Sequence, residues 1–239
     1  METLLAKSSR AVKNVAEQKK RYLYGRILWN KRLVGIKGAR GTGKSTMLLQ
    51  KLQELKLPDN EASYWSLDDL YFLEHSLAAT AEQFYNAGGR MLFLDEVHKY
   101  PDWSRHIKNL YDQYKDLQIV FTGSSIIDLT RQEADLSRRA LMYSLAGMSY
   151  REYLYFHQDL YFEPLSLSDI TANNTAWQKH FPNNFRPLQY FSSYLQSGYY
   201  PFSLEDQEGF LTRMQQTIRI IVEYDMAALQ DFDIRNAQK

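Results

Sequence analysis

Apolar residues along the chain alternate between short β-rich runs and longer runs with helical spacing. The short runs predict strands at 32–37, 62–67, 91–94, 117–121 and 141–145. Apolar residues three or four positions apart predict helices over 45–57, 77–87 and 102–115. Because strands alternating with helices are typical of parallel sheets, we expect an α/β fold with a parallel-sheet core over residues 25–147.

The segments on either side of this core have a helical pattern. Residues 1–24 predict a basic amphipathic helix, and the apolar stripe assigned to it continues to Ile27. Residues 148–239 predict a helical lid, or the start of a C-terminal region, with a polar loop at 171–187 and a long helix at 205–229. We therefore expect three parts, with boundaries near residues 24 and 147.

A glycine-rich segment separates the first predicted strand from the first helix of the core. Residues 38–45, Gly-Ala-Arg-Gly-Thr-Gly-Lys-Ser, fit the pattern G-x-x-x-x-G-K-[ST], in which backbone N–H groups surround phosphate oxygens. Lys44 would contact the β- and γ-phosphates, and Ser45 would ligate Mg²⁺. No Asn-Lys-x-Asp guanine signature is present, so we expect ATP. The expected nucleotide-binding residues are Gly38, Ala39, Arg40, Gly41, Thr42, Gly43, Lys44, Ser45 and Thr46.

Two acids follow the wholly apolar run Met91–Leu94, which predicts a strand buried on both faces. An acid at the carboxyl end of such a strand lies in the crevice where ligands of α/β sheets bind. Asp95 would hold Mg²⁺, and Glu96 would polarise the attacking water. The alternative role for the pair is capping of the next helix. A hydrolase needs a base for water whereas a small-molecule kinase does not, so Glu96 favours hydrolysis.

Hydroxyl groups and arginines further along the chain are candidates for contacts to the γ-phosphate. The run 119–125 ends in Thr-Gly-Ser-Ser, and Ser124 is our candidate sensor of the phosphate or the attacking water. Its alternative role is helix capping. Arg139 is the candidate that would offset charge on the transferring phosphoryl group, from the same chain or from a neighbour. A solvated surface arginine is the alternative for Arg139.

Composition and charge narrow the chemistry. The chain has no cysteine, which excludes a thiol nucleophile, a disulfide framework and a cysteine zinc site. The 29 Lys and Arg nearly cancel the 28 Asp and Glu, but 12 of the basic and only 2 of the acidic residues lie in 1–44. That segment therefore favours anions. With no run of 18 apolar residues and no secretory signal core, we expect a cytoplasmic protein with no membrane span.

Taken together, these motifs resemble the prokaryotic AAA-like P-loop ATPases. The residues that carry the resemblance are 38–46, 92–103, 121–125, 134–154 and 195–201. The resemblance implies a core of the additional-strand, catalytic-glutamate type with Asp95 and Glu96 as its acids. It also implies a nuclease-like C-terminal domain, which this chain would lack as a truncated form. The family usually has Gly-Arg where this chain has Arg138-Arg139, which weakens the assignment of Arg139.

Three functions stay open from the sequence. The first is Mg²⁺-dependent ATP hydrolysis that moves the C-terminal region. The second is an ATP-binding switch with negligible turnover, in which a homo-oligomer or a C-terminal partner domain supplies the arginine. The third is a DNA-associated ATPase, suggested by the basic N-terminal segment, although no base-reading motif is present.

Overall fold

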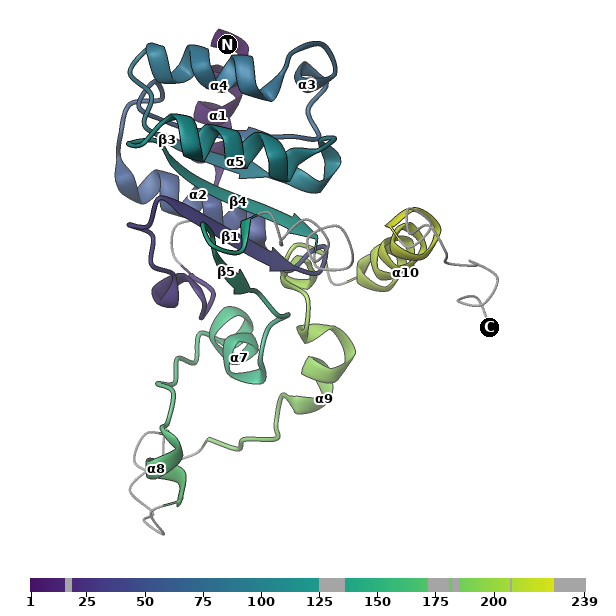
Figure 1. The fold of residues 1–239 in the computed structure, drawn as a ribbon. Helices are drawn as coiled ribbons and strands as arrows, with labels where there is room; N and C mark the ends of the chain where they lie inside the picture. Colours follow the sequence, from purple (N-terminus) through teal and green to yellow (C-terminus); the bar gives the residue numbers. More distant parts are fainter. Residues whose placement is uncertain (16–18, 125–135, 172–180, 182–184, 207, 226–239) are drawn as a thin grey trace. The chain divides into compact units, whose positions relative to one another are not determined.

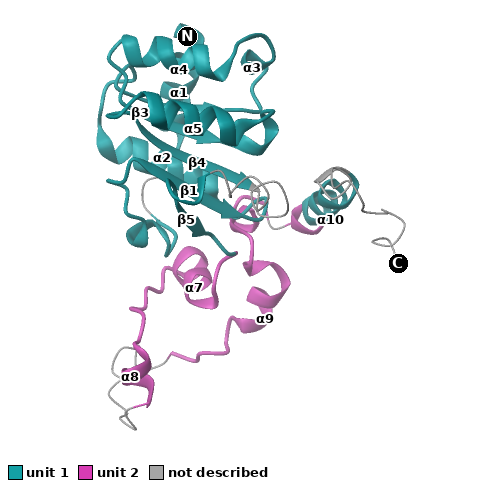
Figure 2. Cartoon of the chain, in the orientation of Figure 1, with its two compact units in different colours: residues 1–146, 212–239 teal, residues 147–211 magenta. Residues whose placement is uncertain are grey.

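The computed structural model describes residues 1–15, 19–124, 136–171, 181, 185–206 and 208–225 (Figure 1). The chain divides into two compact units (Figure 2). Unit 1 comprises Met1–Ala146 with Thr212–Lys239, and unit 2 comprises Gly147–Leu211. The expected division into parts at residues 24 and 147 stays a prediction.

Unit 1 is built on a five-stranded parallel sheet with the order β2-β3-β4-β1-β5. The strands are β1 (Leu33–Gly38), β2 (Ala62–Ser66), β3 (Met91–Asp95), β4 (Gln118–Ser124) and β5 (Leu141–Ser144). Every strand predicted from the sequence is therefore present, and the predicted α/β class is confirmed. Since the strands are parallel, their carboxyl ends lie at one edge of the sheet.

The three predicted core helices are also confirmed, within two residues at each end. They are α2 (Lys44–Leu55), α4 (Leu77–Asn86) and α5 (Trp103–Gln113). A one-turn helix, α3 (Tyr71–Glu74), and a 3₁₀ turn, η2 (Val97–Lys99), lie in the connections. Ser76 caps α4 by accepting the Ala79 N–H, as expected of a serine before a helix.

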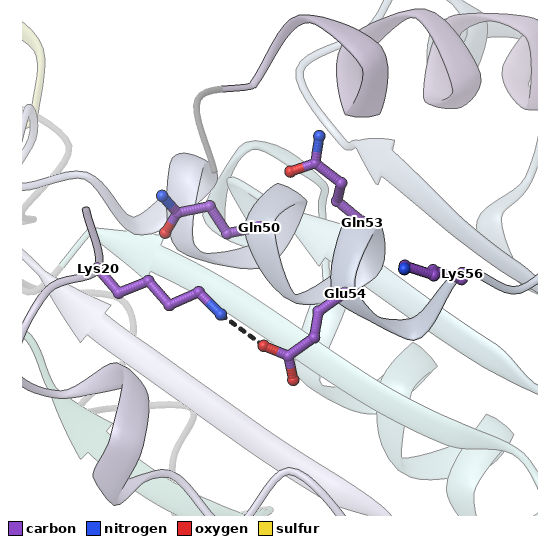
Figure 3. Close-up of a pocket in the computed structure, with 5 residues that line it drawn as sticks. All are labelled: Lys20, Gln50, Gln53, Glu54 and Lys56. Atoms are coloured by element: carbon purple, nitrogen blue, oxygen red, sulfur yellow. Dashed lines mark hydrogen bonds and ion pairs between the residues drawn. The ribbon is translucent and has the colours of Figure 1, made fainter. Parts of the chain in front are cut away.

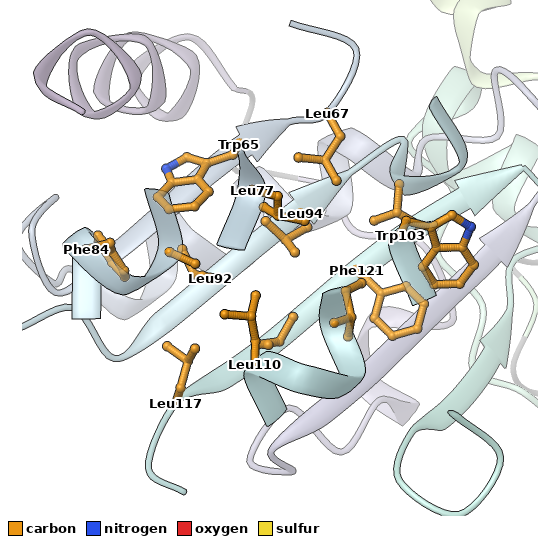
Figure 4. Packing of buried hydrophobic residues seen from close by; sticks show 14 of the residues in the cluster. Trp65, Leu67, Leu77, Phe84, Leu92, Leu94, Trp103, Leu110, Leu117 and Phe121 are labelled. Carbon is orange, nitrogen blue, oxygen red and sulfur yellow. The ribbon is translucent and has the colours of Figure 1, made fainter. Parts of the chain in front are cut away.

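The inner strands of the sheet are buried on both faces. On one face Leu92 and Leu94 of β3 pack with residues of α4 and α5, including Phe84, Trp103 and Leu110 (Figure 4). On the other face Phe93 of β3 packs in a second cluster with Met47, Leu48 and Leu52 of α2. Because successive residues of a strand point to opposite faces, the continuous apolar run of β3 serves both clusters.

The N-terminal segment departs from the predicted helix. Helix α1 (Glu2–Asn14) ends before the extended residue Val15, and residues 24–26 form a separate 3₁₀ turn, η1 (Tyr24–Arg26). A single apolar stripe through Ile27 is therefore wrong. Contacts to α2 explain the difference: Gln50 Nε2 donates to the Lys19 carbonyl at 3.1 Å, and the Tyr24 hydroxyl donates to Glu54 at 2.8 Å. These bonds hold the chain in a non-helical path.

Helix α1 covers the outer edge of the sheet. Strand β2 is an edge strand, and its Tyr64 N–H donates to the Ser8 hydroxyl of α1 at 2.9 Å. Ser8 is buried, and Leu4 of the same helix joins the cluster around Trp65. The helix thereby satisfies a backbone donor that an exposed edge strand would leave unpaired.

Unit 2 begins with the helix α7 (Tyr150–Gln158), which starts at a capping box formed by Ser149 and Glu152. Short helical segments follow at α8 (Leu167–Thr171), α9 (Phe191–Ser193), η4 (Tyr194–Gly198) and η5 (Pro201–Leu204). Tyr153, Leu154 and Phe162 form its small buried cluster. Most of the predicted loop at 171–187 lies outside the described residues.

The predicted helix at 205–229 begins later than expected. Helix α10 (Phe210–Ile220) follows a turn in which Asp206 Oδ1 accepts the Gly209 N–H at 2.8 Å. A π-helical turn, η6 (Ile221–Asp225), continues from it, and residues 226–229 lie outside the described part. Within the described residues, no helix combines the length and apolar character needed to cross a membrane.

A polar pocket beside α2 is lined by Lys20, Gln50, Gln53, Glu54 and Lys56 (Figure 3). Glu54 accepts hydrogen bonds from Lys20, from Lys51 at 2.8 Å and from Tyr24. These bonds, the one from Lys20 first, lower the pKa of Glu54 from 4.5 to about 2. Because the folded pKa is depressed, this stabilisation is present above pH 4.5 and is lost as the pH falls towards 2.

The substitution Glu54→Gln is expected to lower the free energy of unfolding by about 0.5–1 kcal/mol at pH 7, since Glu54 is partly exposed and its ion pairs are screened. The difference from wild type should disappear near pH 2. Urea unfolding at pH 7 and at pH 2.5 measures both values, with Glu61→Gln as the control for an exposed carboxylate. A difference that stayed constant between the two pH values would contradict the prediction.

Candidate nucleotide-binding site

The glycine-rich loop, residues 38–43, connects the carboxyl end of β1 to the first residue of α2. Gly41 and Gly43 have φ values of 78° and 90°, which place both in the left-handed region that favours glycine. A Cβ on Gly38 would lie 2.4 Å from the Leu145 carbonyl oxygen, so that position also excludes a side chain. The loop thus has the tight backbone that the sequence predicted, and its N–H groups precede a helix amino terminus.

Lys44 is buried against the loop. Its ammonium group donates to the carbonyl oxygens of Gly38 and Ala39, both at 3.0 Å. Burial lowers the pKa of Lys44, while the charges of Glu96 and Asp95 act in the opposite direction. A buried ammonium that donates to neutral carbonyl oxygens would form stronger hydrogen bonds to an anion, and phosphate oxygens would supply one.

Asp95 ends β3 at the same edge of the sheet and is almost fully buried. Both of its carboxylate oxygens accept hydrogen bonds: Oδ2 from the Tyr64 hydroxyl at 2.6 Å and Oδ1 from the Thr122 hydroxyl. Burial together with Asp95 raises the pKa of the Tyr64 phenol, while Ser45 of α2 acts in the opposite direction. Tyr64 therefore remains a hydrogen-bond donor to the acid of β3.

Glu96 follows directly and has a φ of 52°, an uncommon left-handed conformation for a residue with a side chain. Its backbone N–H donates to the Thr122 hydroxyl at 3.3 Å, and its carboxylate lies 3.4 Å from His98 Nε2. Strained backbone of this kind persists only where neighbouring contacts hold it. The conformation turns the chain out of the sheet immediately after Asp95.

Sequence reasoning missed Tyr64 and Thr122 as site residues. Thr122 lies beside Asp95 because Leu94 pairs with Phe121 in the parallel ladder. Tyr64 lies on the other neighbouring strand, where it pairs with Phe93. A hydroxyl residue two positions before the last residue of each flanking strand was the available signal, but its use required the strand order to be known.

The structure does not bring Arg139 to the loop. Its guanidinium binds both carboxylate oxygens of Asp112 on α5, at 3.0 and 2.9 Å. It also precedes β5, whose Leu141 pairs with Val34, four residues before Gly38. At about 3.3 Å per residue, Arg139 lies at the opposite edge of the sheet from the loop. A role for Arg139 at the phosphate therefore stays a prediction, and it would need a second copy of the chain.

Ser124 pairs with Gly38 at the end of the β1–β4 ladder, which places its backbone beside the loop. Its side chain lies outside the described part of the structure. The proposed contact between Ser124 and a phosphate therefore stays a prediction. Thr122, two residues earlier on the same strand, is the hydroxyl seen to contact the acids.

The side chains near Asp95 suit a magnesium ion. Mg²⁺ prefers oxygen ligands and is commonly held by one or two carboxylates together with substrate phosphates. Asp95 at the end of β3 and Ser45 in the first turn of α2 offer a carboxylate and a hydroxyl, and both act on the pKa of Tyr64. Among the described residues, no group of three or more His, Cys, Asp or Glu could hold a metal, so the protein alone provides no complete cage.

Two features of unit 1 together define the fold class. Strand β4 lies between β1, which carries the glycine-rich loop, and β3, which ends in the acids. This is the P-loop NTPase fold of the type with an additional strand, as expected from the sequence. The sequence model of the AAA domain matches residues 30–154, which is more than half of the chain. The chain belongs to this AAA domain family.

Comparisons with individual proteins say less about function than the family model does. The chain is 31% identical over 222 residues to "Uncharacterized protein MJ1637" of Methanocaldococcus jannaschii, a match that covers 87% of this chain and 46% of the relative. The chain thus spans about half the length of that curated relative. It is also similar to the solved structure of C. elegans PCH-2, with 15% identity, a TM-score of 0.39, and coverage of 65% of this chain and 43% of that one. Membership of the AAA family indicates ATP binding and ATPase activity in general terms.

Proposed function

We propose that the chain binds Mg²⁺ and ATP at the edge of the sheet described above and hydrolyses the γ-phosphate bond. The observation that carries this proposal is the convergence of the glycine-rich loop, Lys44 and the acids Asp95 and Glu96 at one sheet edge. The charges of both acids act on the Lys44 ammonium, and the Tyr64 hydroxyl donates to Asp95. A phosphate-binding loop at the same sheet edge as the buried Asp95 and the partly exposed Glu96 is the arrangement that hydrolysis of a nucleotide requires.

Nucleotide binding would use the loop and Lys44. The backbone N–H groups of residues 41–45 and the amino terminus of α2 would donate to the phosphate oxygens. Lys44 would exchange its two carbonyl acceptors for phosphate oxygens, which pair better with a buried ammonium. Binding would therefore replace hydrogen bonds within the loop by hydrogen bonds to the ligand.

The carboxylate ligand of the metal would come from the end of β3, and the base would be the residue that follows it. Asp95 and Ser45 would hold Mg²⁺, which when bound neutralises charge on the phosphates. Glu96 would take a proton from the attacking water, and its position after Asp95 is fixed by the Thr122 hydroxyl and by His98. The proton would pass from water to the Glu96 carboxylate as the water oxygen bonds to the γ-phosphorus, while the bond from that phosphorus to the β–γ bridging oxygen breaks and ADP leaves with the electron pair. We further propose that hydrolysis moves the region 148–239.

A second function is favoured by the place of Arg139. Because that arginine is at the far edge of the sheet and paired with Asp112, an isolated chain would bind ATP but turn it over slowly. The protein would then be a nucleotide switch until a second copy or a partner domain supplies an arginine. Turnover measured at increasing protein concentration separates the hydrolase from the switch. Activity per chain should rise with concentration only if a second copy has to supply the arginine.

The first test is the substitution Lys44→Ala. We expect the Kd for ATP to rise about 10- to 100-fold, because a charge-assisted hydrogen bond contributes about 1.5–3 kcal/mol. Phosphate release at subsaturating ATP should fall by the same factor. The control is Lys56→Ala, which removes the same charge just past the other end of α2. Equal affinity of wild type and Lys44→Ala would contradict the proposed site.

A further inference from the structure

Arg21 lies beneath the glycine-rich loop, although the sequence gives it no motif. Its side chain is only 6% exposed. The two terminal nitrogens of the guanidinium donate to different carbonyl oxygens, Nη1 to Thr42 and Nη2 to Ala146 at 2.7 Å. Thr42 belongs to the loop, and Ala146 is the last residue of unit 1 before the chain enters unit 2.

The bond to Thr42 fixes the direction of the next N–H group. No peptide bond in the described part of the chain is cis, and in a planar trans peptide the carbonyl and the following N–H point in opposite directions. With the Thr42 carbonyl turned towards Arg21, the Gly43 N–H points away from Arg21. Gly43 has a φ of 90°, and glycine tolerates either sign of φ, so this peptide could rotate easily without a partner.

The segment that carries Arg21 is itself held in place. Lys19 and Lys20 on one side are bonded to Gln50 and Glu54 of α2, and Tyr24 on the other side also bonds Glu54. The end of β1, which leads into the loop, lies beside the residue that follows β5: the Leu145 N–H donates to the Lys37 carbonyl at 2.7 Å. Arg21 thus bonds to two neighbouring backbone segments, and the residues on either side of Arg21 are held to α2.

We propose that Arg21 is a positioning residue for nucleotide binding, which holds the Thr42–Gly43 peptide in the orientation that presents the Gly43 N–H to a phosphate oxygen. The second bond ties that orientation to Ala146, the residue that leads into unit 2. This inference rests on the proposed function, because it names how that site is kept ready for ATP. In this role Arg21 acts through its bonds to the Thr42 and Ala146 carbonyl oxygens and takes no part in the chemical step.

The test is the substitution Arg21→Lys, which keeps the charge and the aliphatic stem but loses the planar pair of donors. If the ready orientation falls to about one tenth of the population, the Kd and KM for ATP rise about tenfold. The kcat at saturating ATP should stay within about twofold, because bound ATP restores the orientation. In the nucleotide-free chain, the amide signal of Gly43 in ¹⁵N–¹H spectra should shift or broaden.

The matched control is Arg26→Lys, the same change at an exposed arginine of the same segment. It should leave the Kd, KM and Gly43 signal unchanged. An Arg21→Lys chain with unchanged Kd and Gly43 signal, or with lowered kcat and unchanged KM, would overturn the positioning role while wild-type ATP turnover stands. Failure of Arg21→Lys to fold by circular dichroism would also overturn it, and failure of the wild type to bind ATP would instead overturn the proposed function.

Discussion

The substitution Glu96→Gln is expected to reduce phosphate release from ATP by about two to four orders of magnitude, which is the usual contribution of a positioned base. The amide keeps the size of the side chain but cannot accept the proton of the attacking water. ATP affinity should stay within about threefold of wild type, because Lys44, Ser45 and the loop are unchanged. The variant would then accumulate with ATP bound.

Single-turnover measurement with labelled ATP separates binding from chemistry for this variant. The control is Glu61→Gln, the same carboxylate-to-amide change next to the start of β2, at the opposite end of that strand from the acids. It should hydrolyse ATP at the wild-type rate. If Glu96→Gln and wild type released phosphate equally fast, Glu96 would not be the base. The proposal that the chain is an ATP-binding switch with negligible turnover would then gain support.

The substitution Phe93→Ala is expected to lower the free energy of unfolding by about 3–5 kcal/mol, the range found when a buried aromatic ring is removed from a core. Phe93 is fully buried in β3, between α2 and the neighbouring strands. Its loss leaves a cavity that the sheet cannot close, since the strand is paired on both sides. A loss of this size is a large part of the roughly 5–15 kcal/mol that stabilises a typical domain.

Urea unfolding monitored by circular dichroism measures this effect, and the transition midpoint should fall while its slope stays unchanged. Leu28→Ala is the control, because Leu28 is 51% exposed and its removal creates no cavity. A change for Phe93→Ala no larger than that for Leu28→Ala would contradict the buried position of Phe93. Because Phe93 precedes the acids by two residues, ATP binding should weaken only as the folded fraction falls.

The local elements of unit 1 could be predicted because each one follows from its own residues. The apolar run Met91–Leu94 requires burial on both faces, and the glycines of the loop require left-handed backbone. Strand order could not be derived in this way, since a hydrophobic pattern shows that a strand has neighbours but does not name them. The resemblance to the P-loop ATPases implied the additional strand, and the order β2-β3-β4-β1-β5 contains it.

Contacts between segments far apart in the sequence explain why some residues near the site were not predicted. Tyr64, Thr122 and Arg21 each reach the site through a tertiary contact, and no fixed spacing from the glycine-rich loop marks them. The end of α1 was misjudged for a similar reason, because contacts to α2 outweigh the helical pattern of residues 15–27. Arg139 was selected by its chain position, whereas the ladder between β1 and β5 sets where it lies.

The packing of α1 against the edge strand β2 matters for how the chain folds during its synthesis. Residues 2–14 leave the ribosome before residues 62–66, so the segment that forms α1 is available for packing when the edge strand emerges. The Ser8 hydroxyl can then take the Tyr64 N–H before another nascent chain does. Synthesis from the amino terminus thus supplies the segment that covers the edge strand before that strand is made.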